Sequence, residues 1–367
     1  MSKLNIAIAG AGLLGRLLAW RLSLRGHQIT LLEAGRFDKP VSAAHTAAAM
    51  ISPLSEVVIS ERRIYDMGMV SLRLWPQWLA ELQQESAAII HYSANGSIVV
   101  AHQQDWSELQ QFKQDLQARL GTDDRSEWLD THSLAQYEPA LHHFGRGLLL
   151  PGEAYLDNRQ LLQTLLERAR QLSVRCIDTC PVTINEQALQ TAAGISDQFD
   201  LVIDCRGTGA KQSLSHLRGV RGEVLWVETA EISLQHAVRL MHPRYKLYIV
   251  PKPNRQFIIG ATEIESEDRS PISVQSHLEL ASALYTVNPA FAEARIIASD
   301  VNLRPAFTDN LPALIEDGRV LHVNGLYRHG YLLAPVMVNN VLEKIDVVAN
   351  NVNVSNPTQA PELRHRA

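Results

Sequence analysis

Two arginines and a tyrosine occupy positions from which their side chains could bind a carboxylate. Tyr248 lies in the middle of the apolar run at 247–250. Arg304 lies where a second predicted domain returns to the first, and Arg328 precedes a glycine and the predicted start of a helix. Two guanidinium groups and a phenol that converge at a domain junction would form a carboxylate clamp. The alternative for each is a salt-bridged surface arginine or a tyrosine in the core.

A glycine-rich turn near the start of the chain predicts a phosphate-binding site. Gly10, Gly12 and Gly15 follow an apolar run at 5–9 and lead into a helical pattern at 16–25. In this arrangement the first glycine permits a tight turn, the second lets the backbone approach a pyrophosphate, and the third lets the helix pack closely on the strand. The N–H groups and the positive dipole end of the helix would then bind the phosphates.

An acidic residue after the next predicted strand strengthens this interpretation. The apolar run at 29–32 leads directly into Glu33, where a carboxylate would accept hydrogen bonds from the hydroxyls of an adenosine ribose. A turn that binds nothing is the alternative, because glycine-rich turns are common. Strand, glycines, helix and acid all agree with one another here, and this consistency favours dinucleotide binding.

Two further segments fit a large, flat ligand bound at this turn. Residues 41–50 are mostly small, as a backbone packed against a flavin ring would require, although a tightly packed helix start would also explain them. The apolar strand predicted at 200–204 runs into Cys205 and Gly207, as a second pass of the chain beneath the same nucleotide would. A generic strand end explains that second segment equally well.

The composition indicates a globular protein with room for two domains. The chain has 367 residues, of which 46% are hydrophobic and 20% charged, and its formal net charge is −5. Its scattered basic residues do not indicate nucleic acid, and no apolar stretch approaches the roughly 20 residues of a membrane span. Cys176, Cys180 and Cys205 lack metal-like spacing. We therefore predict free thiols, no metal site and, because the first strand leaves no room for a signal peptide, a cytoplasmic protein.

The order of the predicted elements indicates an α/β fold with two interleaved domains. A discontinuous Rossmann-type domain that binds the nucleotide is predicted at 1–90, 145–215 and 304–350. An inserted α+β substrate domain, built on a mostly antiparallel sheet, is predicted at 91–144 and 216–303. Residues 351–367 are polar and contain prolines, so we predict a mobile tail there.

Segments spread over nearly the whole chain carry a resemblance to a known family. They are residues 10–33, 47–50, 247–251, 259–262, 303–305 and 327–335. In these segments and in their order the chain resembles the D-amino-acid oxidase family of FAD enzymes, and most closely its glycine oxidases associated with thiamine synthesis. The resemblance implies FAD as cofactor, hydride transfer to flavin N5 from the carbon that bears the amine, O2 as electron acceptor, and the capacity to form a homo-oligomer.

The resemblance also assigns roles to individual residues. It implies that Arg304 binds the substrate carboxylate, that Tyr248 assists it, and that Arg328 lies beside the site. The helix start at 330–332 would lie near the flavin pyrimidine oxygen, where its dipole stabilises negative charge on the reduced ring. Together, the glycine turn and the resemblance predict cofactor contacts from Gly10, Gly12, Leu13, Leu14, Gly15, Glu33, Ala34, Ala43, Ala44, His45, Thr46, Ala48, Ala49, Met50, Val182, Cys205, Gly207, Arg304, Arg328, His329, Gly330, Tyr331 and Leu332.

The chain departs from the family pattern at several positions. Asn302 stands where the family commonly has glycine, and Glu263 stands where the nearest glycine oxidase pattern is apolar. An acid there would either bind a cationic amine or point to solvent. Some relatives tether the flavin through a histidine, but that position falls on Thr46 here, so non-covalent FAD is predicted, with His45 packed nearby.

A different class of function shares this pattern. Flavoproteins similar to this one act as maturation factors, which oxidise residues of a precursor protein to build a quinone cofactor such as cysteine tryptophylquinone. Such a factor would bind a polypeptide, so the residues that clamp a small substrate would be free to change. Asn302 and Glu263 would then be examples of such changes. An NAD-dependent dehydrogenase fits less well, because residues 328–335 match the FAD family. The sequence favours oxidation of a small amino acid or amine over these alternatives.

Overall fold

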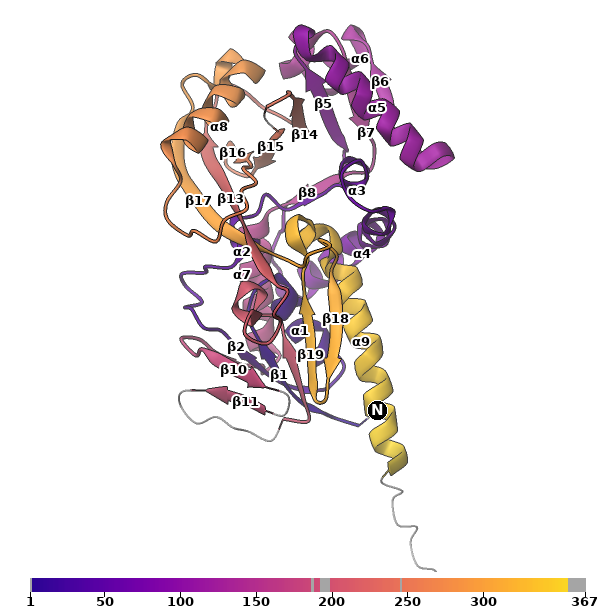
Figure 1. Ribbon diagram of the computed structural model, residues 1–367, viewed down its shortest axis with the longest axis vertical. Coiled ribbons are helices and arrows are strands. Elements are labelled where there is room, and N and C mark those ends of the chain that lie inside the picture. The colour runs from indigo at the N-terminus through magenta and orange to yellow at the C-terminus, as the bar shows by residue number, and fades with distance from the viewer. Residues whose placement is uncertain (1, 186–187, 192–198, 245, 356–367) are drawn as a thin grey trace, which may run out of the picture.

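Two large sheets organise the protein (Figure 1). The structure is a computed structural model that describes residues 2–185, 188–191, 199–244 and 246–355. A sheet of six strands lies in the lower half of Figure 1, and a sheet of eight strands lies in the upper half. Among the helices of the described residues, none combines the length and the hydropathy that a bilayer span requires.

The six-stranded sheet is the predicted Rossmann-type sheet. Its strands lie in the order β18 (Ala313–Asp317), β19 (Val320–Asn324), β12 (Leu201–Asp204), β1 (Asn5–Ala9), β2 (Gln28–Leu32) and β9 (Arg175–Ile177). Neighbouring strands are parallel except β18 and β19. Because β1 lies between β2 and β12, the glycine turn after β1 meets the end of β12, a strand about two hundred residues further along the chain.

Helices cover the six-stranded sheet and share one hydrophobic core with it. They are α1 (Leu13–Leu24), α4 (Arg62–Ser86), α7 (Asn158–Gln171) and α9 (Gly330–Ser355). α1 contacts α7 and α9, and α4 packs along α9. Trp20 of α1 and Trp75 of α4 are fully buried in this core. The helical spacing of apolar residues predicts helices at 60–84 and 332–348. The structure confirms both, with α4 shifted by two residues and α9 longer at each end.

The eight-stranded sheet forms the second layer of the fold. Its strands lie in the order β17 (Arg295–Ala306), β13 (Arg218–Glu228), β16 (Gln256–Gly260), β15 (Lys246–Lys252), β14 (Ala237–Met241), β5 (Ser97–Ala101), β7 (Gly147–Leu150) and β6 (Glu127–Leu129). All neighbours are antiparallel except β5 and β14. The predicted α/β class, with an α+β part on a mostly antiparallel sheet, is confirmed.

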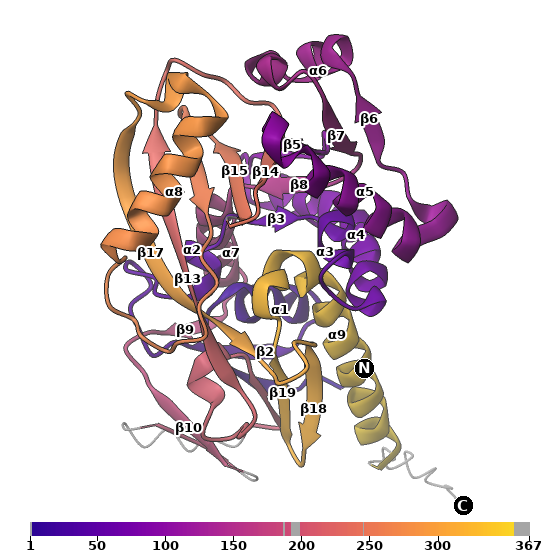
Figure 2. The same cartoon turned by 45° about the horizontal axis from the view of Figure 1, so that its top comes forward.

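Two helices cover opposite faces of the eight-stranded sheet. Figure 2 shows α8 (Val274–Val287) over the strands β15 to β17 and α5 (Trp106–Leu120) on the other side of the molecule, near β5 and β7. Side chains alternate between the two faces of a strand. Accordingly, Ile98 and Val100 of β5 belong to the core that includes α8, whereas Val99 and Ala101 belong to the core of α5.

Short elements connect these layers. A three-stranded sheet joins β3 (Met50–Ile51), β8 (Ala154–Leu156) and β4 (Tyr92–Ser93), and β10 (Val182–Asn185) pairs with β11 (Ala188–Thr191). The short helices are α2 (Ala43–Thr46), α3 (Pro53–Val57) and α6 (Thr131–Tyr137). The 3-10 helices are η1 (Gln103–Asp105), η2 (Gly121–Asp123), η3 (Pro139–Phe144), η4 (Gly207–Ala210), η5 (Pro289–Phe291) and η6 (Tyr327–His329).

The predicted domain boundaries cut across one of the sheets. β7 belongs to the eight-stranded sheet, although its residues fall within the segment 145–215 that was predicted to be part of the nucleotide domain. The boundaries themselves stay predictions. Of the predicted tail, residues 351–355 continue α9, and residues 356–367 lie outside the described residues.

Several elements differ from the sequence-based expectations. The first helix begins at Leu13 and not at Arg16, because Gly12 already has the extended backbone of an N-cap and its carbonyl accepts from the N–H of Arg16 at 3.1 Å. The long strand β17 was not predicted, since its sequence lacks strict alternation and includes Pro305. It is an edge strand, where proline is tolerated, and it pairs with β13 over nearly its whole length.

The close approach of α1 to the glycine turn can be tested by substitution. A methyl group on Gly15 would overlap the carbonyl oxygen of Gly10, whereas one on Gly12 would meet only the Cβ of Ser42 at 3.8 Å. We expect Gly15→Ala to lower the free energy of unfolding of the FAD-free protein by about 1–3 kcal/mol through overpacking. Gly12→Ala is the matched control and should change that free energy by less than about 0.5 kcal/mol. Equal denaturation curves for the two variants would contradict this packing.

Candidate active site

The glycine turn forms one end of a large cavity. Gly10 has φ +96°, and a Cβ there would lie 2.6 Å from the carbonyl oxygen of Cys205, so the turn packs directly on the end of β12. No side chain caps the N-terminus of α1 at Gly12. Gly10, Gly12, Leu13 and Leu14 line the cavity. This helix start therefore presents backbone N–H groups and its positive dipole end to whatever is bound there.

Glu33 lies beside the same turn and is already partly engaged by the backbone. Its Oε2 accepts a hydrogen bond from the N–H of Ala11 at 2.7 Å, and its Oε1 accepts from the N–H of Gly35 at 3.0 Å. An ionised carboxylate has about four lone-pair sites, so both oxygens can accept further hydrogen bonds. The backbone thus fixes the orientation of Glu33, which lines the cavity together with Ala34, as binding of ribose hydroxyls would require.

The small-residue segment forms one wall of the cavity and is held from behind. Asn158 donates hydrogen bonds to the carbonyls of Ala44 and His45, and Tyr331 donates its hydroxyl hydrogen to Ala44 at 2.9 Å. The buried Lys252 donates to the carbonyl of Ala48 at 2.8 Å, and burial lowers the pKa of its ammonium to about 7. These bonds fix the backbone of the wall while leaving its small side chains toward the cavity.

The strand predicted at 200–204 is β12, and the chain that follows it lies against the glycine turn. Cys205 and Gly207 line the cavity at the end of β12, with Val182 of β10 nearby. Asp204 supports this turn. Burial alone would raise the pKa of Asp204, but hydrogen bonds from Arg206 and His322 outweigh it and lower that pKa to about 2. An ionised Asp204 therefore anchors the Arg206 backbone and guanidinium beneath the nucleotide end of the cavity.

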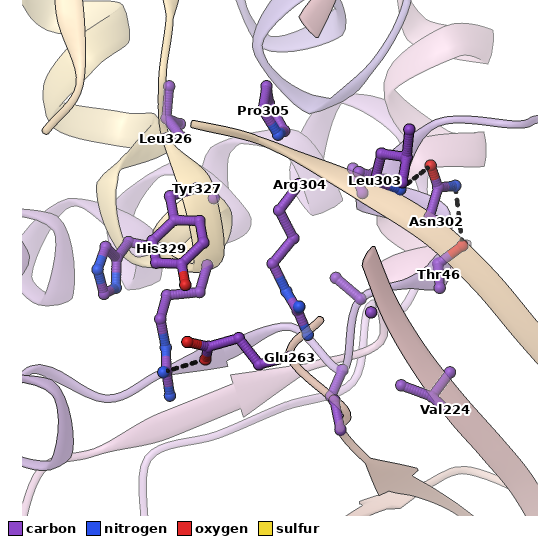
Figure 3. Close-up of a pocket in the computed structure, with 18 of the residues that line it drawn as sticks. Thr46, Val224, Glu263, Asn302, Leu303, Arg304, Pro305, Leu326, Tyr327 and His329 are labelled. Atoms are coloured by element: carbon purple, nitrogen blue, oxygen red, sulfur yellow. Dashed lines mark hydrogen bonds and ion pairs between the residues drawn. The ribbon is translucent and has the colours of Figure 1, made fainter. Parts of the chain in front are cut away.

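Polar and charged side chains from distant segments meet at the other end of the cavity. We call them the inner polar cluster, and they are Glu56, Arg239, Tyr248, Glu263, Arg304, Tyr327 and Arg328. Figure 3 shows Glu263, Arg304 and Tyr327 of this cluster facing one another across the pocket. They come from α3, from strands β14, β15 and β17 of the eight-stranded sheet, from the loop after β16 and from η6.

Arg328 lies between two carboxylates. Its Nε is 3.0 Å from Oε2 of Glu56, and its Nη1 donates to Oε2 of Glu263 at 2.8 Å. Burial would lower the pKa of Arg328, but the two carboxylates together raise it. Arg328 is thus permanently charged and already neutralised, so it is a poor candidate for a direct substrate clamp.

Glu56 is buried and charged at neutral pH. Burial would raise the pKa of Glu56, yet Arg328, His329 and Arg239 together hold it below the ordinary value of 4.5. Arg239 contributes a contact of 3.7 Å to this carboxylate. Burial lowers the pKa of His329 to about 4, so its ring is neutral near pH 7. The positive charge that balances Glu56 therefore comes from the arginines.

Arg304 is the arginine whose charge is free for a ligand. Its Nη1 and Nη2 donate to the carbonyls of Arg221 and Thr262 at 3.2 and 3.0 Å. Among the residues that the structure describes, no carboxylate forms an ion pair with it. A side chain on Gly222 would collide with this guanidinium, so that glycine makes room for the arginine. Arg304 is therefore oriented by the backbone and keeps its charge for an anion in the cavity.

Tyr248 lies against the same end of the cavity. In the sheet register it is opposite Gly260 on one side and Arg239 on the other. Burial raises the pKa of Tyr248, although Arg304 and Arg328 partly offset this. Its phenol is therefore a neutral hydrogen-bond donor at neutral pH, which suits the proposed assisting role.

The structure brings most of the predicted site residues to this cavity. Of the cofactor contacts predicted from sequence, all line it except Gly15 and His45. Gly15 packs α1 onto the turn, and His45 lies outside the lining, where burial lowers the pKa of its ring. Thr46 does line the cavity, and its hydroxyl accepts a hydrogen bond from Asn302 at 3.1 Å.

Three members of the inner polar cluster were missed from the sequence. Glu56 meets Arg328 across 272 positions of sequence, and nothing local marks that pairing. Arg239 is in a strand that was not predicted. Tyr327 could have been found most readily of the three, because it stands next to Arg328 in the segment 327–335 that carries the family resemblance. Its backbone has φ +51°, a left-handed conformation that a non-glycine residue adopts when surrounding contacts require it.

The cavity fits a flavin dinucleotide. Its volume is about 1350 Å³, above the roughly 300–1,000 Å³ typical of a small-molecule site, so it can hold a dinucleotide and a small substrate together. The uncapped helix start and Glu33 form the nucleotide end, and the small-residue wall leads to the inner polar cluster. Such a site, on a Rossmann-type sheet with a second sheet beside it, defines the class of flavin-dependent oxidoreductases.

Comparisons with known proteins agree with this class. The chain matches the family of FAD dependent oxidoreductases (DAO) over residues 5–338 and belongs to that family, so its cofactor is FAD. It is 39% identical, over 93% of its length and 96% of the relative's, to a putative thiamine biosynthesis oxidoreductase ThiO of Rhizobium etli. It is 25% identical to the glycine oxidase of Geobacillus kaustophilus, over 90% of each chain. The crystal structure of glycine oxidase from Geobacillus kaustophilus shares the fold, with a TM-score of 0.81 over 95% of both chains.

The buried carboxylate of Glu56 generates a stability prediction. Glu56→Gln keeps the size of the side chain but leaves Arg328 with only the more exposed Glu263 as its charged partner, which should cost about 1–3 kcal/mol of unfolding free energy at pH 7. Because the folded pKa of Glu56 lies below its ordinary 4.5, the stability it contributes is present above that value and is lost as the pH falls through the folded pKa.

Denaturant unfolding of wild type and variant between pH 3 and pH 7 measures this difference. The gap between the two proteins should be largest near neutral pH and close at acid pH. Glu127→Gln, at an exposed position on β6, is the control and should match wild type throughout. A gap for Glu56→Gln that does not depend on pH would contradict the ionised state of this carboxylate.

Proposed function

We propose that this protein oxidises the carbon–nitrogen bond of a small amino acid or amine, glycine first among them, with O2 as the electron acceptor. The observation that carries the proposal is the unpaired guanidinium of Arg304 at the end of the cavity opposite the glycine turn. An oriented arginine in a cavity that also has room for a flavin is suited to bind a substrate carboxylate through two hydrogen bonds.

The chain's own residues supply binding and orientation. Arg304 binds the carboxylate, and the neutral phenol of Tyr248 donates a further hydrogen bond beside it. Bound FAD supplies the redox chemistry, accepting a hydride at N5 and passing the electrons to O2 to give hydrogen peroxide. The N-terminus of α9 at Gly330 lines the cavity, and its dipole favours negative charge nearby. Holding the amino acid in one orientation is the main contribution of this site.

FAD is proposed to bind without a covalent link. His45 does not line the cavity, and the hydroxyl of Thr46, at the position where some relatives tether the flavin, is engaged by Asn302. A threonine hydroxyl is also a far weaker nucleophile than an imidazole nitrogen. The contacts of the glycine turn, Glu33 and the small-residue wall therefore have to hold the cofactor by themselves.

The relatives favour a small substrate over a precursor protein. The proteins reported above are named for thiamine biosynthesis and for glycine oxidation, and they match the chain over nearly its whole length. The maturation-factor alternative rested on Asn302 and Glu263 as signs that the residues binding a small substrate had changed. Both residues make specific contacts in the site, Asn302 with Thr46 and Glu263 with Arg328, and these contacts support an intact small-molecule site.

The proposal predicts turnover of free amino acids. Purified holoenzyme should release hydrogen peroxide with glycine, and more slowly or not at all with larger amino acids of either hand. A peroxidase-coupled assay with glycine, sarcosine and several D-amino acids measures this. Peroxide release from none of them, by a protein that contains its full complement of FAD, would refute the proposed function.

The role of Arg304 predicts a selective loss of substrate binding. Arg304→Ala removes a charged hydrogen-bonding pair of the kind that contributes about 1.5–3 kcal/mol, so KM for glycine should rise about 10- to 100-fold or more. The FAD content should stay at the wild-type level, because the glycine turn and Glu33 lie at the other end of the cavity. Arg295→Ala, an exposed position on the same strand, is the matched control. Unchanged kinetics in Arg304→Ala would remove this arginine from the site.

A further inference from the structure

We propose that Glu263 binds the amine of the substrate and makes the site specific for molecules that carry a carboxylate and an amine on the same carbon atom. This inference rests on the proposed function, since it names the substrate class of the same site. It assigns a specificity-determining role to a residue at which the chain departs from the nearest glycine oxidase pattern.

Glu263 is adjacent to the proposed carboxylate-binding group. It follows Thr262, whose carbonyl accepts a hydrogen bond from Nη2 of Arg304 at 3.0 Å. In Figure 3 the Glu263 side chain lies beside the Arg304 guanidinium and below the ring of Tyr327. A positive and a negative group therefore stand next to each other on the wall of the cavity. A short substrate with both charges on one carbon could bring its carboxylate to Arg304 and its amine to Glu263.

The neighbouring ion pairs leave Glu263 as the carboxylate that a cation in the cavity can reach. Arg328 is paired with both Glu56 and Glu263, and Arg239 lies 3.7 Å from Glu56. Glu56 is the more buried carboxylate of the two, with a side chain 10% exposed against 44% for Glu263. Two arginines thus balance Glu56, whereas Glu263 shares Arg328 with it and lines the cavity. An ammonium group in the cavity would therefore meet the charge of Glu263 and not that of Glu56.

The carboxylate of Glu263 also has hydrogen-bonding capacity left for a ligand. Arg328 donates to its Oε2 at 2.8 Å. Burial and the charge of Glu263 raise the pKa of Tyr327 to about 12, so its phenol stays a neutral hydrogen-bond donor beside this carboxylate. Arg328 occupies one of about four lone-pair sites of the carboxylate, and the remaining sites can accept N–H groups from an amine. Arg328 and Tyr327 thereby act as positioning residues for Glu263.

This arrangement predicts which molecules bind. Glycine satisfies Arg304 with its carboxylate and Glu263 with its amine. Glycolate, which has a hydroxyl in place of the amine, satisfies Arg304 but offers no positive charge to Glu263. Glycolate should therefore bind the wild-type site more weakly than glycine, and removal of the Glu263 charge should abolish this preference.

The test compares the holoenzymes of wild type and Glu263→Gln, whose side chains have nearly the same shape. Binding of glycine and of glycolate is followed by the change that each causes in flavin absorbance. Glycine is added without oxygen, and its binding is read from the early absorbance change, before the flavin is reduced. KM and kcat for glycine are measured in parallel. Glu265→Gln is the matched control, because Glu265 is exposed and pairs with Arg218 outside the inner polar cluster.

We expect Glu263→Gln to raise KM for glycine by about tenfold or more, the effect of one charged hydrogen bond, with a smaller change in kcat. Glycolate affinity should stay the same or increase, and Glu263→Asp should recover part of the glycine affinity. An equal loss of glycine and glycolate binding would overturn the proposal, because it would mean that Glu263 only positions Arg328. A glycine affinity within about twofold of wild type would overturn it as well.

These outcomes are separate from a failure of the proposed function. If wild-type holoenzyme releases no peroxide with any amino acid, the oxidase activity is refuted, whereas the absorbance titrations still report binding. Glycine that binds more tightly than glycolate in wild type but not in Glu263→Gln would then still support the amine-binding role. Absence of that preference in wild type would refute it.

Discussion

A buried guanidinium held between two carboxylates is the interaction on which the rest of the site depends. Arg328 joins Glu56, which follows the small-residue wall, to Glu263, which follows a strand of the second sheet. Glu56 is the buried partner of Arg328 and Glu263 is the more exposed one, so a single guanidinium ties the three segments together at this end of the cavity. The cavity therefore has one charged, rigid end, and Arg304 is left as the arginine with a free charge.

The interleaved order of the chain explains how such an end can form. The Rossmann-type sheet supplies the nucleotide end through the turn after β1 and the end of β12, while the second sheet supplies Tyr248 and Arg304 from β15 and β17. Because β13 and β17 pair over almost their full lengths, Arg304 is placed close to the point where the chain returns to the first sheet. On the proposed function, the cofactor and the substrate would therefore be bound by different sheets and would meet between them.

Much of the nucleotide end could be predicted from sequence, because its signals are local. Gly10, Gly12 and Glu33 lie within one strand–turn–helix–strand unit, and each has a backbone or hydrogen-bonding role that few other residues fulfil. Glu56 and Arg239 could not be found in this way, since their partners are set by tertiary packing between segments far apart. β17 could not be predicted for a related reason. Its pairing with β13 determines its conformation more than the alternation of apolar and polar residues in its own sequence does. Residue types alone made Arg304 and Arg328 both candidates for the clamp, and the resemblance placed Arg304 on the carboxylate and Arg328 beside the site. Their partners in the structure now give the physical difference, since Arg328 pairs with two carboxylates and Arg304 donates to backbone carbonyls.

An amino acid bound at Arg304 is proposed to deliver its hydride to the bound flavin, and a single-turnover experiment tests this step. Glycine is mixed with the purified yellow holoenzyme in the absence of oxygen, and the absorbance of the oxidised flavin is followed. The account predicts that glycine bleaches the flavin and that admission of air restores it. A flavin that dithionite reduces but that glycine and the other small amino acids leave oxidised would contradict the account.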